Sequence, residues 1–480
     1  MRSILIVVVL IFTINFSSSA QSIQQHKNDS VFVLVKKYFN AQQPDSIYLL
    51  AGDIVKKEFT AETFRYVFEN QLFPAGQIKE SNLLNFLNNK IGVYNLTFDS
   101  GRLELWMSLD DQGKLDMLQF KPPVKDAGNK IERAATTNLM RTLTDKKVDS
   151  AARTYIQKAN TVGLSIGILR NGVATTYNYG ETALGNYKLP NANSIYEIGS
   201  ITKTFTATLL AWYVNEGKVK LTDPITKYLP DSVSSNQNLE GITLEMLSNH
   251  TSGLPRLPDN FVNHSGYPLD PYRDYTKQHL FSYLKTCKPE SKPGENYSYS
   301  NLGYGLLGAI LEKVSGKTFE EMVEEIICQP LGIKSTVQHL TPAQRQRFLK
   351  EYNAGGQETS PWLFDVLAPL GALRSTVNNL LTYAKANITP NGTKLSKAFQ
   401  LTHRITFNKA DIKLGIGWHI IVVNNVEYYC HDGETFGSSS FLAFNAGKKL
   451  AIVVLSNSGA SVNAMAVDLI KRIQSINPTD

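Results

Sequence analysis

The segment from Ile201 to Asn215, in which every residue other than Lys203 is apolar, Thr or Asn, constrains the fold more than any other stretch of the sequence. Lys203 is its only side chain that is ionised in water at neutral pH. A helix that is apolar on nearly every face is a buried helix, and Gly217 is the expected stop after its last turn. The sequence therefore predicts a buried central helix that carries a single lysine.

Ser200 stands directly before this helix, three residues ahead of Lys203. Two residues at that spacing share one helix face, with Cβ atoms about 5–6 Å apart. Burial disfavours the charged form of a lysine, and a neutral amine can take the proton that a serine loses when it becomes a nucleophile. The pattern alone supports equally well a Ser200 that only caps the helix.

A second Ser-x-x-Lys pattern, Ser282 to Lys285, provides a comparison. It lies in an amphipathic run with polar flanks, from Lys277 to Lys285, and no helix start falls at its serine. We therefore predict a surface or half-buried helix there and assign the chemistry to Ser200 and Lys203.

Residues 1–20 are typical of a secretory signal peptide, with Arg2 before an apolar run and small residues at its end. The apolar run is too short to span a bilayer. We expect an exported protein, periplasmic or extracellular, with no membrane span after signal removal. Three cysteines (Cys287, Cys328 and Cys430) are too few for a disulfide framework, although one pair remains open.

The charge distribution argues against a nucleic-acid-binding protein. The chain has 49 basic and 42 acidic residues, a net charge of +7, without a basic cluster on one element. Its eight histidines show no zinc-binding spacing. We therefore predict neither a metal nor another cofactor.

Residues 21–121 are expected to form a small α+β accessory domain. Helical periodicity over residues 31–40 and 61–72 precedes three segments with period two, which predict an antiparallel meander; these are residues 91–98, 103–109 and 115–120. The element order resembles that of cystatin-like and nuclear-transport-factor-like domains. Residues 122–129 are predicted to be a linker, followed by a larger domain over residues 130–480.

The larger domain is expected to open with a helical run over residues 129–159 and a hairpin turning at Arg170–Gly172. Residues 256–275 lack periodicity and predict a surface loop that rims a site. The last third returns to strands and ends in a helix over residues 462–474. The expected strands are residues 414–423, 426–430, 438–444 and 450–455, with His431–Gly433 interrupting them.

Tyr299 and Asn301 are expected where a turn at Pro293–Gly294 leads into a helix. Two residues so placed can point into one cavity, although a buried tyrosine and a helix cap would explain them as well. Three glycines in the following helix weaken it by propensity. We therefore expect that helix to pack closely against a neighbour.

Three motifs in this order, Ser200-Ile-Thr-Lys203, Tyr299-Ser-Asn301 and His431-Asp-Gly433, closely resemble the active-site set of the serine β-lactamase and penicillin-binding protein superfamily. The Tyr-x-Asn motif resembles the class C-like branch, which includes D-alanyl-D-alanine carboxypeptidases, D-aminopeptidases and esterases. The match implies an α+β fold, an antiparallel sheet flanked by helices plus a helical subdomain, over residues 130–480.

The resemblance also implies a role for each motif residue. Ser200 would be the acyl-accepting nucleophile, with Lys203 and Tyr299 exchanging its proton. Asn301 would hydrogen-bond the substrate amide and hold Lys203 in place. His431 and Gly433 would help to bind the substrate. The backbone amides of Ser200 and Glu434 would form the oxyanion hole, usually a large catalytic term.

Two residues depart from the class C pattern. His431 stands where typical class C β-lactamases carry Lys, and with an ordinary pKa near 6.5 it would be a weaker, pH-dependent partner for a carboxylate. This favours a peptidase or esterase over a dedicated β-lactamase. Glu434 stands where relatives often have Gly, and its charge would disfavour anionic substrates.

The leading hypothesis is an exported serine hydrolase that forms an acyl-enzyme at Ser200. It would cleave an amide or ester bond as a D-alanyl-D-alanine carboxypeptidase-like enzyme or a D-amino-acid peptidase. The expected substrates are small peptides, esters or β-lactams, including peptidoglycan fragments. The alternatives are a promiscuous carboxylesterase or weak β-lactamase of the same fold, and a catalytically weak penicillin-binding pseudoenzyme.

Overall fold

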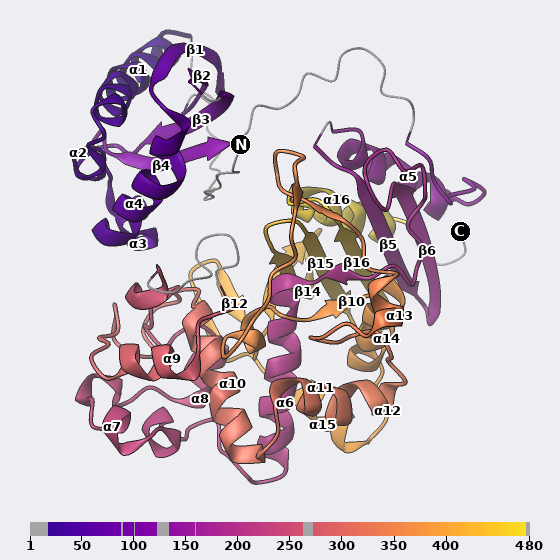
Figure 1. Ribbon diagram of the computed structural model, residues 1–480. Helices are drawn as coiled ribbons and strands as arrows, with labels where there is room; N and C mark the ends of the chain where they lie inside the picture. The colour runs from indigo at the N-terminus through magenta and orange to yellow at the C-terminus, as the bar shows by residue number, and fades with distance from the viewer. Residues whose placement is uncertain are drawn as a thin grey trace. The chain divides into compact units, whose positions relative to one another are not determined.

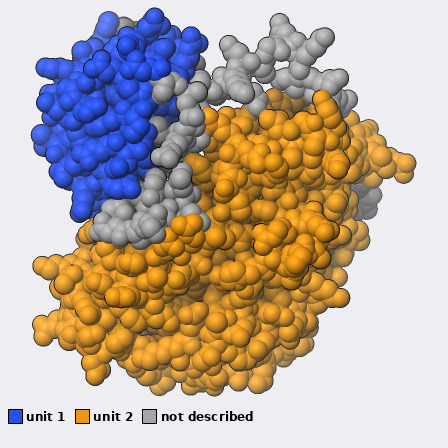
Figure 2. Space-filling view, viewed as in Figure 1, with its two compact units in different colours: residues 1–126 blue, residues 127–480 orange. Residues whose placement is uncertain are grey.

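The computed structural model of the protein describes residues 18–87, 90–99, 101–121, 134–158, 160–262 and 272–476. The chain forms two compact units, residues 1–126 and 127–480 (Figure 2). Residues 1–17 of the expected signal peptide, the expected linker and much of the expected rim loop lie outside the described residues. Within the described ranges, no helix combines the length and the apolar character that a membrane span needs.

The first unit packs short helices against a four-stranded antiparallel sheet (Figure 1). Its elements are α1 (Ser18–Asn40), α2 (Pro44–Tyr48), α3 (Asp53–Glu58), α4 (Ala61–Val67), β1 (Ile78–Leu87), β2 (Ile91–Phe98), β3 (Gly101–Leu109) and β4 (Leu115–Lys121). The rings of Phe68, Phe73, Phe98 and Phe120 surround Phe39, with centroids 5.1–6.1 Å away. A cluster of aromatic rings thus lies within this core, beside buried aliphatic side chains.

The three strands predicted in this unit are confirmed, and a fourth was missed. Strand β1 pairs with β2 at the edge of the sheet. Its first half, Lys79 to Asn82, is wholly polar, so it lacks the alternation of apolar and polar residues that marks a half-buried strand.

The second unit is built on an eight-stranded antiparallel sheet in the order β11-β12-β13-β14-β15-β16-β5-β6 (Figure 1). These strands are β5 (Gly163–Arg170), β6 (Val173–Gly180), β11 (Phe407–Lys409), β12 (Ile412–Leu414), β13 (His419–Val423), β14 (Val426–Glu434), β15 (Ser439–Asn445) and β16 (Leu450–Ser456). Two small two-stranded sheets add β7 (Tyr196–Glu197) with β10 (Arg374–Ser375), and β8 (Glu351–Tyr352) with β9 (Glu358–Thr359).

Helices cover both faces of the large sheet. Successive side chains of a strand point to opposite faces, and every residue of β16 is buried. Ile452 and Val454 belong to the core shared with α5 (Leu143–Ile156) and α16 (Asn463–Gln474). Val453 and Leu455 belong to the opposite core, which α14 (Val377–Ile388) shares. The antiparallel sheet flanked by helices that the resemblance implied is therefore confirmed.

Among its described residues, the second unit has nine further α-helices, one of which is α6 (Thr202–Asn215). The others are α7 (Asp231–Ser234), α8 (Leu244–Ser248), α9 (Lys277–Leu284), α10 (Asn301–Ser315), α11 (Phe319–Val323), α12 (Gln329–Leu331), α13 (Pro342–Arg345) and α15 (Lys394–Thr402). Helix α6 packs against α10, α11 and α15, and Gly217 has a φ of 69° after its end. The predicted buried helix and its stop are confirmed.

The glycines of α10 allow the close packing that the sequence predicted. A Cβ atom on Gly305 would lie 2.2 Å from the Leu367 side chain, and one on Gly308 would lie 1.9 Å from the Pro369 ring. No side chain larger than hydrogen fits at either position without moving its neighbour. The second Ser-x-x-Lys pattern falls on α9, where Ser282 and Lys285 are exposed as expected.

Three expectations for the larger domain were wrong. The helix expected over residues 129–159 does not include the described residues 134–142; α5 begins at Leu143, where Thr142 and Asp145 form a capping box. The strand expected over residues 414–423 is divided between β12 and β13, because Gly417 adopts a φ of 76° between them. His431–Gly433 does not interrupt the sheet; it continues β14 as far as Glu434. All three cysteines are buried and free.

Candidate active site

Ser200 and Lys203 meet at the start of α6. Ser200 lies in a single 3-10 turn, Gly199–Ile201, that leads directly into the helix. The Lys203 Nζ atom lies 2.9 Å from Ser200 Oγ and 2.7 Å from the carbonyl oxygen of Leu370. No side chain caps α6, so the interpretation of Ser200 as a mere helix cap was wrong. Its hydroxyl faces the amine instead.

Lys203 is fully buried, and this burial is the main reason why its pKa lies well below the ordinary 10.5. The positive charge of Arg256 lowers the pKa further, and the negative charge of Asp432 opposes both effects. A lysine in this environment can be a neutral amine at neutral pH. It then has a lone pair with which to accept the Ser200 proton.

Tyr299 reaches the same point from the turn before α10. Burial raises the pKa of its phenol, while a hydrogen bond with Ser200 and the charge of Arg256 lower it. The Lys203 Nζ atom lies 5.0 Å from the centroid of the Tyr299 ring. Tyr299 therefore keeps its proton at neutral pH and stands beside both Ser200 and Lys203 as a proton donor.

Asn301 is the first residue of α10 and is buried. Its Oδ1 atom has no hydrogen-bond partner among the described residues, so the expected bond with Lys203 is not made in this structure. A buried amide oxygen without a partner is costly. It is available to accept the N–H of a substrate amide.

The end of β14 supplies the third motif. His431, Gly433 and Glu434 pair with β15 on one side, whereas β13 begins at His419, opposite Cys430, and leaves the other side of these residues open. A Cβ atom on Gly433 would lie 2.8 Å from the Ser200 amide nitrogen.

The predicted oxyanion donors lie on adjoining stretches of backbone. A Cβ atom on Gly199 would lie 2.7 Å from the Glu434 amide nitrogen, so the strand passes directly against the turn that carries Ser200. The structure therefore places the backbone nitrogen atoms of Ser200 and Glu434 on neighbouring segments, as an oxyanion hole requires.

His431 is neutral in this site. It is 2% exposed, and its burial is the first cause of a pKa of about 3, with His419 and Lys203 lowering it and Asp432 raising it. Its Nδ1 atom lies 2.6 Å from the Asp432 carbonyl oxygen. Because a carbonyl can only accept, Nδ1 carries the proton and Nε2 is left as an acceptor. His431 thus lacks the positive charge that a class C lysine would bring.

Sequence reasoning missed two further histidines and an arginine. His250 has a φ of 61° and its Nδ1 accepts the Ser300 amide at 3.0 Å, which places its ring 4.3 Å from that of Tyr299. The His419 ring lies 5.2 Å from that of His431. Arg256 holds its guanidinium 5.3 Å from the Tyr299 ring centroid. No periodicity or spacing in the sequence predicts that these residues approach Tyr299, because their approach depends on tertiary packing.

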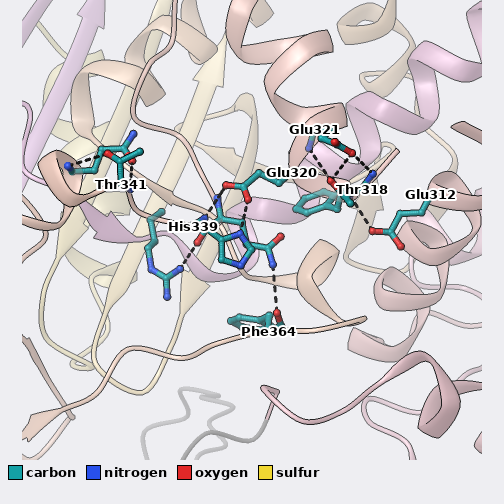
Figure 3. A network of polar contacts seen from close by, with 11 residues as sticks. Glu312, Thr318, Glu320, Glu321, His339, Thr341 and Phe364 are labelled. Carbon is teal, nitrogen blue, oxygen red and sulfur yellow. Dashed lines mark hydrogen bonds and ion pairs between the residues drawn. The ribbon is translucent and has the colours of Figure 1, made fainter. Parts of the chain in front are cut away.

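A buried ion pair supports the turn that carries the nucleophile. Glu197, three residues before Ser200, accepts a 2.9 Å hydrogen bond from Arg374, and both side chains are buried. The same guanidinium donates to the carbonyl of Gln338. The backbone of Gln338 and His339 is held in turn by Glu320, whose Oε1 accepts both amides at 2.8 Å (Figure 3).

The half-buried His403 predicts a loss of stability in acid. Burial lowers the pKa of His403 from 6.5 to about 4, so its contribution is complete above pH 6.5 and is lost as the pH falls towards 4. The linkage amounts to at most about 3 kcal/mol of the free energy of unfolding. We expect thermal unfolding between pH 7 and 4.5 to show a smaller acid shift in His403→Gln than in the wild type. Equal shifts in the two proteins would contradict this.

Comparison with known proteins agrees with this geometry. Residues 148–474 match the family model "Beta-lactamase". A β-lactamase of Pseudomonas fluorescens is 29% identical over 348 residues, which cover 65% of this chain and 92% of that protein. AmpH of Escherichia coli (strain K12), a D-alanyl-D-alanine-carboxypeptidase/endopeptidase, is 34% identical over 203 residues, 42% of this chain and 52% of that protein.

Solved structures show the same fold. A crystal structure described as a β-lactamase/D-alanine carboxypeptidase from Pseudomonas syringae superposes with a TM-score of 0.63 at 25% identity. It covers 70% of this chain, and this chain covers all of it. A class C β-lactamase superposes with a TM-score of 0.64 at 24% identity, covering 72% of this chain and 99% of that chain.

The family model covers more than half of the chain, and the motif side chains that the resemblance assigned meet in one site. The chain therefore belongs to the β-lactamase family of the serine β-lactamase and transpeptidase superfamily, and it is a serine hydrolase.

Proposed function

We propose that this protein is an exported serine hydrolase that forms an acyl-enzyme at Ser200 and releases D-amino acids from small peptides, as a D-alanyl-D-alanine carboxypeptidase does. The observation that carries the proposal is the pair of opposed pKa shifts around one hydroxyl. Lys203, with a lowered pKa, lies 2.9 Å from Ser200 Oγ, and Tyr299, with a raised pKa, hydrogen-bonds the same serine. Such a division marks one group as base and the other as acid.

In acylation, Lys203 takes the proton of Ser200 while Oγ forms a bond to the substrate carbonyl carbon. The negative charge on the carbonyl oxygen is stabilised by the amides of Ser200 and Glu434. Tyr299 then gives its proton to the leaving amine as the C–N bond breaks, and recovers a proton from the Lys203 ammonium. Asn301 accepts the N–H of the substrate amide through its unpartnered Oδ1.

Deacylation repeats these transfers with water in place of the amine. Water loses a proton towards Tyr299 and Lys203 as its oxygen attacks the ester carbonyl. The Ser200 oxygen leaves and takes a proton back, which restores the starting protonation states. Because Lys203 and Tyr299 both hydrogen-bond Ser200, one pair of groups can serve both half-reactions.

The neutral state of His431 distinguishes this site from that of a dedicated class C β-lactamase, which typically carries Lys at this position. A neutral imidazole does not offer a β-lactam carboxylate the ion pair that a lysine offers. The names of AmpH and of the Pseudomonas syringae enzyme agree with a carboxypeptidase activity. A promiscuous carboxylesterase or weak β-lactamase uses the same chemistry and is the second candidate.

A penicillin-binding pseudoenzyme would need only the fold. Against it stands the cost of the site: a fully buried lysine and a buried, unpartnered Asn301 oxygen both destabilise the folded protein. Strained or costly groups of this kind collect where chemistry is performed. Export is part of the proposal and rests on the signal-like residues 1–20.

Covalent labelling tests the proposal. A fluorescent penicillin or fluorophosphonate should label the wild type and not Ser200→Ala. Equal labelling of the two proteins, or of neither, would contradict an acyl-enzyme at Ser200. An acyl-D-Ala-D-Ala peptide and a panel of p-nitrophenyl esters then separate peptidase from esterase by the values of kcat/KM.

Glu434 gives a second test, of substrate charge. Its side chain is exposed beside Asp432, so we expect Glu434→Gly to raise turnover of carboxylate-bearing substrates several-fold by removing a repulsive charge. Turnover of a neutral ester should change less. Unchanged kcat/KM for the carboxylate-bearing substrate would reject the idea.

A further inference from the structure

Among the described residues of the site, the permanent positive charge belongs to Arg256, which the sequence analysis did not single out. His431 is neutral, and Lys203 has a lowered pKa and is fully buried. Arg256 is exposed, and a guanidinium stays charged at every physiological pH. Arg256 is therefore the residue that can offer a substrate carboxylate a permanent positive charge in this region.

Arg256 is fixed to the element that carries the motif residues. Its carbonyl oxygen accepts the amides of Asn301 at 3.0 Å and Leu302 at 3.1 Å, the first two residues of α10. Pro255, just before it, accepts a 2.7 Å hydrogen bond from the Ser300 hydroxyl. The backbone of Arg256 is thus tied to the start of α10, so its side chain begins from a defined position.

The guanidinium lies within the electrostatic reach of the reacting groups. It stands 5.3 Å from the Tyr299 ring centroid, and its charge acts on Lys203, Tyr299 and Glu434. No described residue forms an ion pair with it. An arginine with free N–H donors matches a carboxylate in shape and can hold it by two parallel hydrogen bonds.

We propose that Arg256 determines substrate specificity by binding a carboxylate of the peptide substrate. This rests on the proposed function and names the substrate class of the same site: acyl donors that carry an anionic group. The carboxylate comes either from the C-terminus of the leaving residue or from a side chain on the acyl side. In both cases Arg256 binds a carboxylate that lies close to the Tyr299 ring.

Matched substrates separate the two sources. We would measure kcat and KM of the wild type, Arg256→Gln, Arg256→Lys and Arg345→Gln with an acyl-D-Ala-D-Ala peptide and its C-terminal carboxamide. A second pair differs only by Glu or Gln on the acyl side, and a third pairs p-nitrophenyl hemisuccinate with p-nitrophenyl butyrate. Arg345 is an exposed arginine of α13 and controls for net charge.

We expect Arg256→Gln to lower kcat/KM about 10- to 100-fold on carboxylate substrates, mainly through KM, which is the range for loss of a charge-assisted hydrogen bond. The neutral partner of each pair should change less than about threefold by the same reasoning, and Arg256→Lys should restore part of the loss. The substrate pair for which Arg256→Gln no longer prefers the charged member identifies the source of the carboxylate.

Equal losses on the charged and neutral members of every pair would overturn the proposal, as would equal effects of Arg256→Gln and Arg345→Gln. Failure of the proposed function is visible separately, as turnover that survives in Ser200→Ala. If the wild type cleaves only esters, the hemisuccinate and butyrate pair still decides the role of Arg256.

Discussion

Lys203→Arg is expected to slow acylation of Ser200 by about 10²- to 10⁴-fold, the usual contribution of a general base. The guanidinium keeps the length and charge of the protonated lysine but does not give up its proton at any pH at which the protein is folded. It therefore cannot accept the proton of the Ser200 hydroxyl, which lies 2.9 Å from Nζ in the native site. The measurement is the rate constant for covalent labelling by a fluorophosphonate.

The second Ser-x-x-Lys pattern provides the matched control. Lys285 is exposed just after α9, three residues beyond Ser282, so Lys285→Arg should label at the wild-type rate. Thermal unfolding of both variants shows whether the larger side chain is accommodated at the buried position. A folded Lys203→Arg that labels within threefold of the wild type would exclude Lys203 as the base.

Gly433→Ala is expected to lower kcat by about 10²- to 10³-fold, the cost of losing one oxyanion donor. The added Cβ atom would lie 2.1 Å from the Ile198 carbonyl oxygen, 2.6 Å from Ser440 Oγ and 2.8 Å from the Ser200 amide nitrogen. Two of these are backbone atoms, so β14 must move away from the nucleophile. The Glu434 amide moves with it.

Gly447→Ala is the control for this substitution. Its Cβ atom would meet only the Asn445 side chain, at an ordinary 3.5 Å, in a turn at the far end of β15. Turnover of a p-nitrophenyl ester and the midpoint of thermal unfolding are measured for both variants. Wild-type turnover in Gly433→Ala would show that catalysis does not require the close approach of β14 to Ser200.

The parts of the site that the sequence predicted are those governed by local geometry. Ser200 and Lys203 lie one helical turn apart, and the apolar residues around them require burial, so their contact follows from helix periodicity. The cap at Ser300 and the close packing of Gly305 and Gly308 follow from similarly local rules. The meeting of these elements with His431 was indicated only by the resemblance to a family.

The parts that sequence reasoning missed depend on tertiary packing. Arg256 and His250 reach Tyr299 because the Arg256 carbonyl and the His250 ring accept amides at the start of α10, and no periodicity of the sequence predicts those contacts. The polar and glycine residues after Cys430 suggested a loop, yet β14 continues because β15 pairs with it through Glu434. The neutral state of His431 likewise depends on burial that only the folded chain creates.

The most direct test of the site is the pH dependence of Ser200 labelling by an uncharged fluorophosphonate. A base with a strongly lowered pKa predicts a labelling rate that reaches its plateau well below the ordinary lysine pKa and falls only as Lys203 becomes protonated at lower pH. A rate that instead keeps rising to the ordinary lysine pKa, about 10.4, would mean that Lys203 is charged in the free enzyme, and would contradict its assignment as the base.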